Sequence, residues 1–263
     1  MKGDKPMIQK SIDQLCLMDD IFTRAFFNDE IECIELVLQI IMDMPDLKVV
    51  ESQIQKVLSN TNGRSVCLDV YATGSDGRNY DIEVQVDDKG ADIKRARFNS
   101  ALMDAAEIKS GHNYNELNES YVIFITEKDV LGKGLPIYHI DRYVKETGEP
   151  AYDGTHIIYV NNAIQDETAL GRLMHDFSCT DADQMYYDLL ANRTRFMKTN
   201  KEARKSMSSI IEQLVEESVA QKIVRFVENV QKKFDYDLQS ACDLAECTEE
   251  EYYAAKKILE KQS

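Results

Sequence analysis

The fold of this chain is decided by the stretch SVCLDVYATGSDGRNYDIEVQVDD, residues 65–88. Two segments in which apolar and polar residues alternate flank GSDGR, which is rich in turn-forming residues. This pattern predicts two antiparallel strands, at residues 65–73 and 79–87, that are joined as a hairpin. Successive side chains of a strand point to opposite sides, so the hairpin has one apolar face and one polar face.

Two acids face each other on the polar side of this hairpin. With residues 74–78 as the loop, antiparallel pairing sets Asp69 opposite Glu83, with β-carbons about 5 Å apart. Like charges in this position destabilise a sheet by up to about 1 kcal/mol unless a cation lies between them. Mg²⁺ would relieve the repulsion, and it leaves positions open for a phosphate oxygen and an attacking water. The hairpin therefore predicts a metal site for phosphodiester hydrolysis, with the Val84 carbonyl and the Gln85 side chain close to it. The alternative is a solvent-exposed polar face, which would show the same alternation.

Helices and further strands are expected on both sides of the hairpin. Apolar spacing predicts two helices within residues 13–45, a helix at 91–109, strands at 47–58 and 121–126, and edge strands at 136–140 and 156–160. The predicted fold class is α/β, with a restriction-endonuclease-like core of helix, three-strand meander, helix and strand, followed by the edge strands. This core is expected to fill residues 1–175.

Residues 176–263 are predicted to form a helical C-terminal extension. Residues 181–234 contain no glycine or proline and keep helical periodicity. Two short helices are expected after them, and Thr248 with Glu251 has the spacing of a capping box at the start of the second. This pair is either a helix-turn-helix remnant or simple packing, and the acidic start of its last helix favours packing.

The overall charge is hard to reconcile with a nucleic-acid partner. The 263 residues carry a net charge of −16, whereas binding to a phosphate backbone depends largely on lysine and arginine. Basic residues do gather in two stretches, one with Lys94, Arg95 and Arg97 and one that runs through residues 193–205. Either stretch is a local binding surface or a solvated helix face.

Composition also indicates where the protein works. The longest apolar runs fall short of the roughly 20 residues that cross a bilayer, and the start MKGDKPMIQKSIDQL lacks the apolar region of a signal peptide. A soluble, cytoplasmic protein without a membrane partner is therefore expected. Six cysteines are scattered without a CxxC pair, so they are interpreted as reduced and mostly buried thiols, with neither a zinc site nor a disulfide framework.

Several segments in a fixed order carry a family resemblance. They are DDIFTRAFF (19–27), GRSVCLDVYA (63–72), YDIEVQ (80–85), KRARFNSALMD (94–104) and YVIFITEKDVLGKGLPIYHIDR (121–142). Together they resemble the recombination-promoting nuclease and transposase family of the PD-(D/E)xK nuclease superfamily, over residues 13 to about 230. The resemblance implies a metal-dependent DNA endonuclease that is linked to mobile elements or recombination, with Mg²⁺ or alternatively Mn²⁺ as cofactor.

Carried onto this sequence, the resemblance implies roles for particular residues. Asp69 and Glu83 would be metal ligands, and Asp20 in the first helix an additional acid. Gln85 stands where the superfamily has a catalytic lysine, and its neutral amide can orient a water but cannot offset charge. The basic residues Lys94, Arg95 and Arg97, named above, would meet the DNA backbone.

Three functions remain open at this point. The first is the endonuclease, for which a homodimer is expected because cutting both strands with one site per chain favours a symmetric pair. The second is a catalytically inactive nuclease fold that acts as an interaction or regulatory module, which the glutamine and the acidic charge favour. The third, a transposase with strand transfer, needs sequence-specific end binding, for which no motif is found.

Overall fold

The computed structural model describes residues 12–60, 63–86 and 90–260. Its helices are α1 (Asp20–Phe27), α2 (Ile31–Ile41), α3 (Ile93–Glu107), α4 (Ala169–Ser178), α5 (Asp188–Thr199), α6 (Lys201–Phe234), α7 (Leu238–Leu244) and α8 (Glu249–Glu260). Its strands are β1 (Val49–Leu58), β2 (Val66–Gly74), β3 (Asn79–Gln85), β4 (Ser120–Thr126), β5 (Ile137–Ile140) and β6 (Thr155–Asn161). Short 3-10 helices occur at Ile12–Gln14, Tyr114–Glu116 and Ala182–Gln184.

The strands form one six-stranded sheet in the order β1-β2-β3-β4-β6-β5. The first three pair antiparallel as the predicted meander, β3, β4 and β6 are mutually parallel neighbours, and β5 is antiparallel to β6. The predicted α/β fold class is confirmed. One detail was wrong: the segment at 156–160 is not an edge strand, because β6 is inserted between β4 and β5 and is hydrogen-bonded on both sides.

The hairpin of β2 and β3 has the predicted register. Tyr71 pairs with Asp81 and Thr73 with Asn79, and the same register continued along the strands sets Asp69 opposite Glu83. The apolar side is buried as expected. The polar side is buried too, since Asp81 and Glu83 are both 0% exposed. A solvent-exposed polar face is thereby excluded, because α3 covers these acids.

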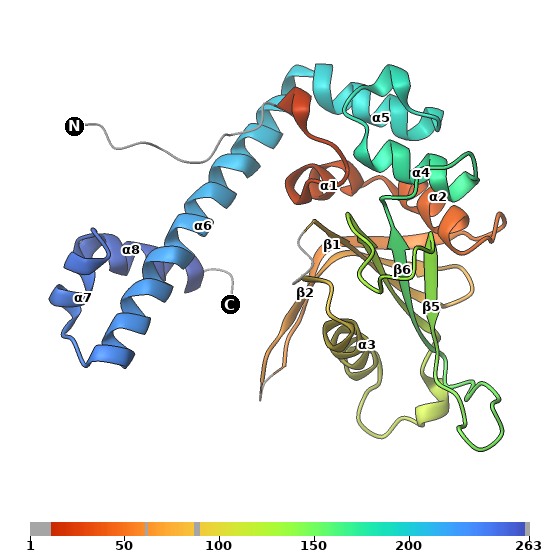
Figure 1. Cartoon of the computed structure of the whole chain (residues 1–263), viewed down its shortest axis with the longest axis horizontal. Coiled ribbons are helices and arrows are strands. Elements are labelled where there is room, and N and C mark those ends of the chain that lie inside the picture. Colours follow the sequence, from red (N-terminus) through yellow and green to blue (C-terminus); the bar gives the residue numbers. More distant parts are fainter. Residues whose placement is uncertain (1–11, 61–62, 87–89, 261–263) are drawn as a thin grey trace. The chain divides into compact units, whose positions relative to one another are not determined.

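Helices lie on both sides of the sheet. α3 contacts β1, β2, β4 and β6, whereas α1 contacts β1, β2 and β3 and α2 contacts β1. Figure 1 shows α3 on one side and α1, α2, α4 and α5 grouped on the other. Phe22, Phe26 and Phe27 of α1 form a buried aromatic cluster, which reaches Phe177 of α4 with ring centroids 6.5 Å apart. These contacts hold α1 beside the start of β2.

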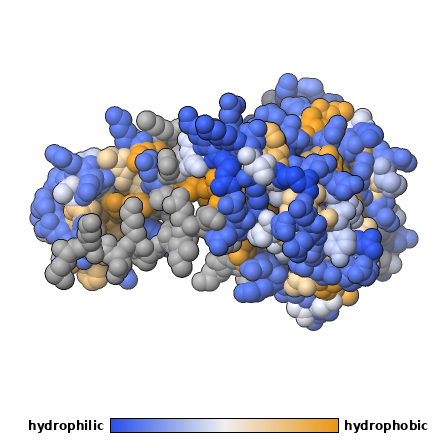
Figure 2. All heavy atoms as spheres, turned by 90° about the horizontal axis from the view of Figure 1, so that it is seen from above, coloured by the Kyte–Doolittle hydropathy of each residue, from blue (hydrophilic) through white to orange (hydrophobic). Residues whose placement is uncertain are grey.

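The chain divides into two compact units, residues 1–203 and 204–263. The sequence indicated a division at residue 175, which lies inside α4. α4 and α5 belong with the sheet because α5 is bonded to the first helices: Arg193 forms an ion pair of 2.7 Å with Glu30, and Lys198 Nζ donates to the Leu15 carbonyl at 2.6 Å. Figure 2 shows a mostly hydrophilic face with hydrophobic residues in separate patches. Among the described residues no helix is both long and apolar enough to span a bilayer.

The second unit contains most of α6 with α7 and α8. Its core is formed by Val224, Val227 and Val230 of α6 with Cys242 of α7 and Tyr252 of α8, among others. The capping box predicted at the start of α8 is confirmed. The Glu251 backbone N–H donates to Thr248 Oγ1 at 3.1 Å, and the Thr248 N–H donates to the Glu251 carboxylate at 2.8 Å.

The cysteines follow the sequence interpretation only in part. All six are free thiols, but only Cys33 and Cys242 are buried, and Cys67 is exposed. Cys67 lies in β2 next to Leu68, which is fully buried. Cys67 shares the face of Asp69 but is exposed near the start of β2, so the interpretation of the thiols as mostly buried was wrong.

Candidate active site

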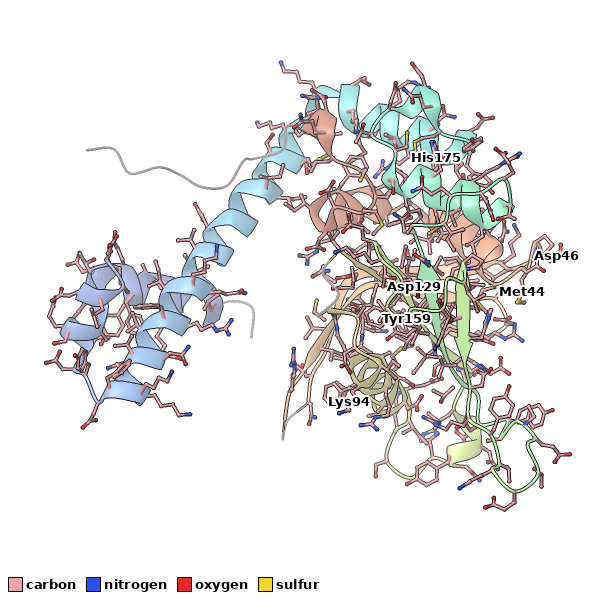
Figure 3. All side chains as sticks on the ribbon, viewed as in Figure 1. Met44, Asp46, Lys94, Asp129, Tyr159 and His175 are labelled. Carbon is pink, nitrogen blue, oxygen red and sulfur yellow. The ribbon has the colours of Figure 1, made fainter. Side chains whose placement is uncertain are left out.

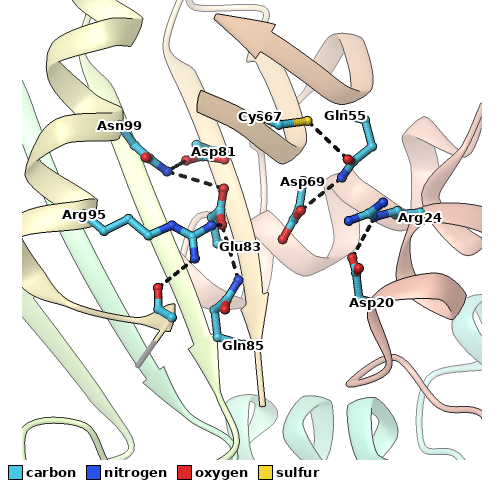
Figure 4. A network of polar contacts seen from close by, with 11 residues as sticks. Asp20, Arg24, Gln55, Cys67, Asp69, Asp81, Glu83, Gln85, Arg95 and Asn99 are labelled. Atoms are coloured by element: carbon cyan, nitrogen blue, oxygen red, sulfur yellow. Dashed lines mark hydrogen bonds and ion pairs between the residues drawn. The ribbon is translucent and has the colours of Figure 1, made fainter. Parts of the chain in front are cut away.

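Three acids gather on the polar side of the hairpin. Asp69 projects from β2, and Asp81 and Glu83 project from β3. Asp69 is 8% exposed. Figure 4 shows Asp69 and Glu83 on neighbouring strands, with Asp81 next to Asn99 of α3. The sheet therefore brings together the pair predicted from the sequence and adds a third acid.

α3 supplies the polar partners of these acids. Asn99 Nδ2 donates to Asp81 Oδ2 at 3.1 Å and to Glu83 Oε1 at 3.4 Å. Arg95, one turn earlier, forms an ion pair with Glu83 Oε2 and donates to the Gly90 carbonyl at 2.7 Å. Asp92 caps the helix by accepting from the Lys94 N–H. The cap sets where α3 begins, and thereby which side chains face the acids.

Asp69 is held from the other side. Gln55 Nε2 donates to Asp69 Oδ1 at 3.0 Å, and Gln55 itself adopts a positive φ of 54° within β1. On α1, Asp20 forms an ion pair of 2.7 Å with Arg24. A pocket of about 530 Å³ is lined by Asp20, Arg24 and Asp69, and also by Gln55, Val84, Gln85 and Arg95. The structure therefore brings Asp20, Val84 and Gln85 to the site where the sequence placed them.

Burial dominates the electrostatics of the acids. Desolvation, followed by the charge of Asp69, raises the pKa of Glu83 to about 8. Desolvation, followed by the charge of Asp20, raises the pKa of Asp69, and desolvation with Glu83 raises the pKa of Asp81 well above its ordinary value. Arg95 lowers the pKa of each acid, and Arg24 also lowers that of Asp69, but two guanidiniums do not balance these three carboxyls together with Asp20. The site is short of positive charge.

The donor set fits a hard divalent cation. Within the described residues, no group of three or more His, Cys, Asp or Glu side chains forms a ready-made metal cage. Asp69 and Glu83 instead offer two carboxylates, and Asp20 and Gln85 add further oxygen atoms from the lining of the pocket. These are the ligands that Mg²⁺ prefers while it keeps several waters. Two buried oxygens beside the site, Asp81 Oδ1 and Asn99 Oδ1, have no hydrogen-bond donor among the described residues. A cation near these atoms would offset the excess negative charge.

Gln85, which the family resemblance sets at the position of the superfamily's lysine, lies beside Glu83. Its Nε2 is 3.5 Å from Glu83 Oε2, a long hydrogen bond. Its Oε1 lies close to Gly90, where a Cβ would be 2.0 Å from it. Gly90 therefore leaves the space that lets the amide turn toward Glu83, and the glutamine occupies the predicted position.

The predicted basic residues separate into two groups. Lys94 and Arg97 are exposed and make no ion pair with a described residue, while Arg95 turns inward to Glu83. In the second stretch, Arg193 donates to backbone carbonyls of α1, Lys198 donates to the segment before α1, and Arg195 pairs with Asp183 at 2.6 Å. These three side chains stabilise the fold and are therefore not free to bind a ligand.

Sequence reasoning missed three site residues. Asp81 is on the polar face that the alternation defines, so its position in the strand could have indicated that it belongs to the site. Asn99 lies five residues after Lys94, within a segment noted for family resemblance, but nothing in the pattern showed that it turns toward the acids. Gln55 depends on its left-handed backbone conformation, which no local signal marks.

Comparison with known proteins gives one finding. A family model described as "PD-(D/E)XK nuclease family transposase" matches residues 22–245. No curated protein and no solved structure matches the chain. The match includes most of α1, the whole sheet, α3 and the helices that follow as far as α7. It contains the residues of the site except Asp20, which lies two residues before the match begins.

Proposed function

The chain belongs to the PD-(D/E)XK nuclease transposase family, and we propose that it is a divalent-metal-dependent endonuclease that hydrolyses DNA phosphodiester bonds. The family is one of nucleases that usually use divalent metals and act on DNA. The observation that supports the proposal is the pair of buried, facing carboxylates, Asp69 and Glu83. Asp69 lines the pocket, together with the polar side chains of Asp20, Gln55 and Gln85, among others.

Each residue of the pocket has a task in this proposal. Asp69 and Glu83 hold the ion, with Asp20 and the Val84 carbonyl as further oxygen donors near it. The ion, when bound, polarises the scissile phosphate and lowers the pKa of a bound water. The Gln85 amide orients the attacking water by hydrogen bonding. Because an amide is neutral, it offsets no charge in the transition state, and slow turnover is expected.

The remaining residues act on the acids and on the substrate. Asn99 holds the carboxyls of Asp81 and Glu83 in place from α3. Lys94 and Arg97 bind phosphates of the DNA backbone, since both are exposed and free of ion pairs with described residues. Arg95 contacts Glu83 and is the third predicted contact to the substrate.

The test is plasmid nicking by the full chain with Mg²⁺ or Mn²⁺. Asp69→Asn and Glu83→Gln keep the shape of each side chain and remove its charge, so both are expected to abolish cutting without loss of folding. Glu146→Gln, at an exposed position, is the matched control and should cut like the wild type. Cutting that survives both site variants would overturn the assignment.

Gln85, together with the ion pair between Arg95 and Glu83, favours a second candidate, an inactive nuclease fold that acts as an interaction or regulatory module. In that case Arg95 would permanently occupy the place of the ion. Calorimetry separates the two functions, because only the enzyme requires a divalent ion that binds through Glu83. If the wild type gives heat on binding Mg²⁺ and Glu83→Gln does not, the result supports the enzyme. If the wild type gives no such heat, the result supports the inactive module.

Other parts of the expected function stay predictions. They are a homodimer, a cytoplasmic location, and a role in mobile-element movement or recombination. The homodimer would be detected by light scattering of the full chain at micromolar concentration.

A further inference from the structure

A second hollow, of about 1040 Å³, lies beside the active site on the side of α3. We call it the α3 groove. One wall is formed by α3, and the other by the segment that leads into β2, residues 64–67. Arg142, which follows β5, also lines it. Figure 3 shows Lys94 on α3, where it contributes to the first wall.

The α3 groove is basic, although the chain as a whole is acidic. Its lining includes five basic residues, Arg64, Lys94, Arg95, Arg97 and Arg142, and two acidic ones, Asp92 and Asp104. The whole chain has a net charge of −16. A local excess of positive charge against this background concentrates the affinity for a polyanion in one place.

Three of these cations are available to a ligand. Arg64, Lys94 and Arg97 are exposed and form no ion pair with any residue that the structure describes. Arg142 is different, because it pairs with Asp153, and Arg95 is held by Glu83. Arg64 stands on the wall opposite α3, so free charges line both sides of the groove.

The α3 groove adjoins the active site, because Cys67 and Arg95 line both hollows. A polymer with regularly spaced phosphates fits this arrangement better than a small anion, because the charges are spread along the groove rather than gathered at one point.

We propose that the α3 groove binds the DNA backbone on one side of the scissile phosphate, with Arg64 on one wall and Lys94 and Arg97 on the other. The inference rests on the proposed function for its substrate and adds Arg64 and a path for the DNA. The contacts are to phosphates, so binding is expected to be independent of base sequence.

The test measures how the affinity of the full chain for a fluorescein-labelled 20-base-pair DNA duplex depends on salt. EDTA is present to remove divalent ions, so that no cutting occurs. Each phosphate contact contributes about 0.9 to the slope of log affinity against log salt. Arg64→Gln is therefore expected to reduce the slope by about 1 and Arg64→Gln with Arg97→Gln by about 2. Arg172→Gln, on α4 and outside the groove, is the matched control and should leave the slope unchanged.

Each result tests DNA binding in the α3 groove separately from nuclease activity. A reduced slope in the groove variants supports binding in the groove, whether or not any variant or the wild type cuts DNA with Mg²⁺. An unchanged slope, or a wild type that does not bind the duplex at low salt, overturns the groove even if the protein cuts. A second duplex of unrelated sequence should give the same slopes, and a change confined to one sequence would contradict backbone binding.

Discussion

Glu83 is expected to make the stability of the metal-free protein fall as pH rises. Burial and the charge of Asp69 raise its pKa from the ordinary 4.5 to about 8. The folded protein therefore keeps a proton that the unfolded chain releases above pH 4.5. The stabilisation is fully present below that pH and is lost as pH rises through about 8. Glu83→Gln removes the ionisable group and with it this part of the pH dependence.

The size of the effect follows from proton linkage. Between pH 5 and pH 8, the unfolded chain gains nearly the full free energy of ionising this carboxyl, whereas the folded protein gains almost none. The difference is on the order of 3 kcal/mol. It is a substantial part of the roughly 5–15 kcal/mol that stabilises a typical domain.

The measurement is urea unfolding in EDTA, followed by circular dichroism, at several values between pH 5 and pH 8. Other groups titrate as well, so the informative quantity is the wild-type free energy of unfolding minus that of Glu83→Gln at each pH. This difference should fall by on the order of 3 kcal/mol over the range. Glu146→Gln, which changes the same chemical group at an exposed position, should give a difference that does not vary with pH.

Added Mg²⁺ supplies a second check. If the ion binds ionised Glu83, it should stabilise the wild type more at pH 8 than at pH 5, because fewer protons then compete for the site. Equal pH dependence in the wild type and in Glu83→Gln would refute the reasoning, since it would mean that this carboxyl is ionised in the folded protein at every pH tested.

Two further predictions concern the side chains of α3. Arg95→Gln should tighten Mg²⁺ binding in calorimetry, because it removes a cation that pairs with Glu83 and competes with the ion. Arg97→Gln, on the exposed side, should change the affinity for Mg²⁺ little. Weaker Mg²⁺ binding by Arg95→Gln would contradict this competition. Asn99→Ala should lower the free energy of unfolding by about 1–3 kcal/mol, since it removes a donor to the buried Asp81 carboxyl and one of the donors to Glu83. Asn115→Ala, at an exposed position, is its control in urea unfolding, and equal losses in the two variants would argue against a role for the Asn99 hydrogen bonds.

The sheet and the facing acids could be predicted because their signals are local. Alternation has a period of two residues, and the turn between β2 and β3 sets the register, so the pairing of Tyr71 with Asp81 follows from a few neighbouring residues. The order of β4 and β6 in the sheet is different. It depends on which strands meet after a long connection, and the apolar segment of β6 alone does not distinguish an interior strand from an edge strand.

The sequence by itself determined that Asp69 and Glu83 share one face of a hairpin, opposite each other. Only the tertiary structure decided that this face is buried, because α3 packs over it and brings Asn99 and Arg95 to the acids. It also decided which basic residues are free, since an ion pair such as that of Arg193 with Glu30 joins segments far apart in the chain. Alternation is a property of neighbours along the backbone, whereas burial and charge pairing depend on contacts between distant segments.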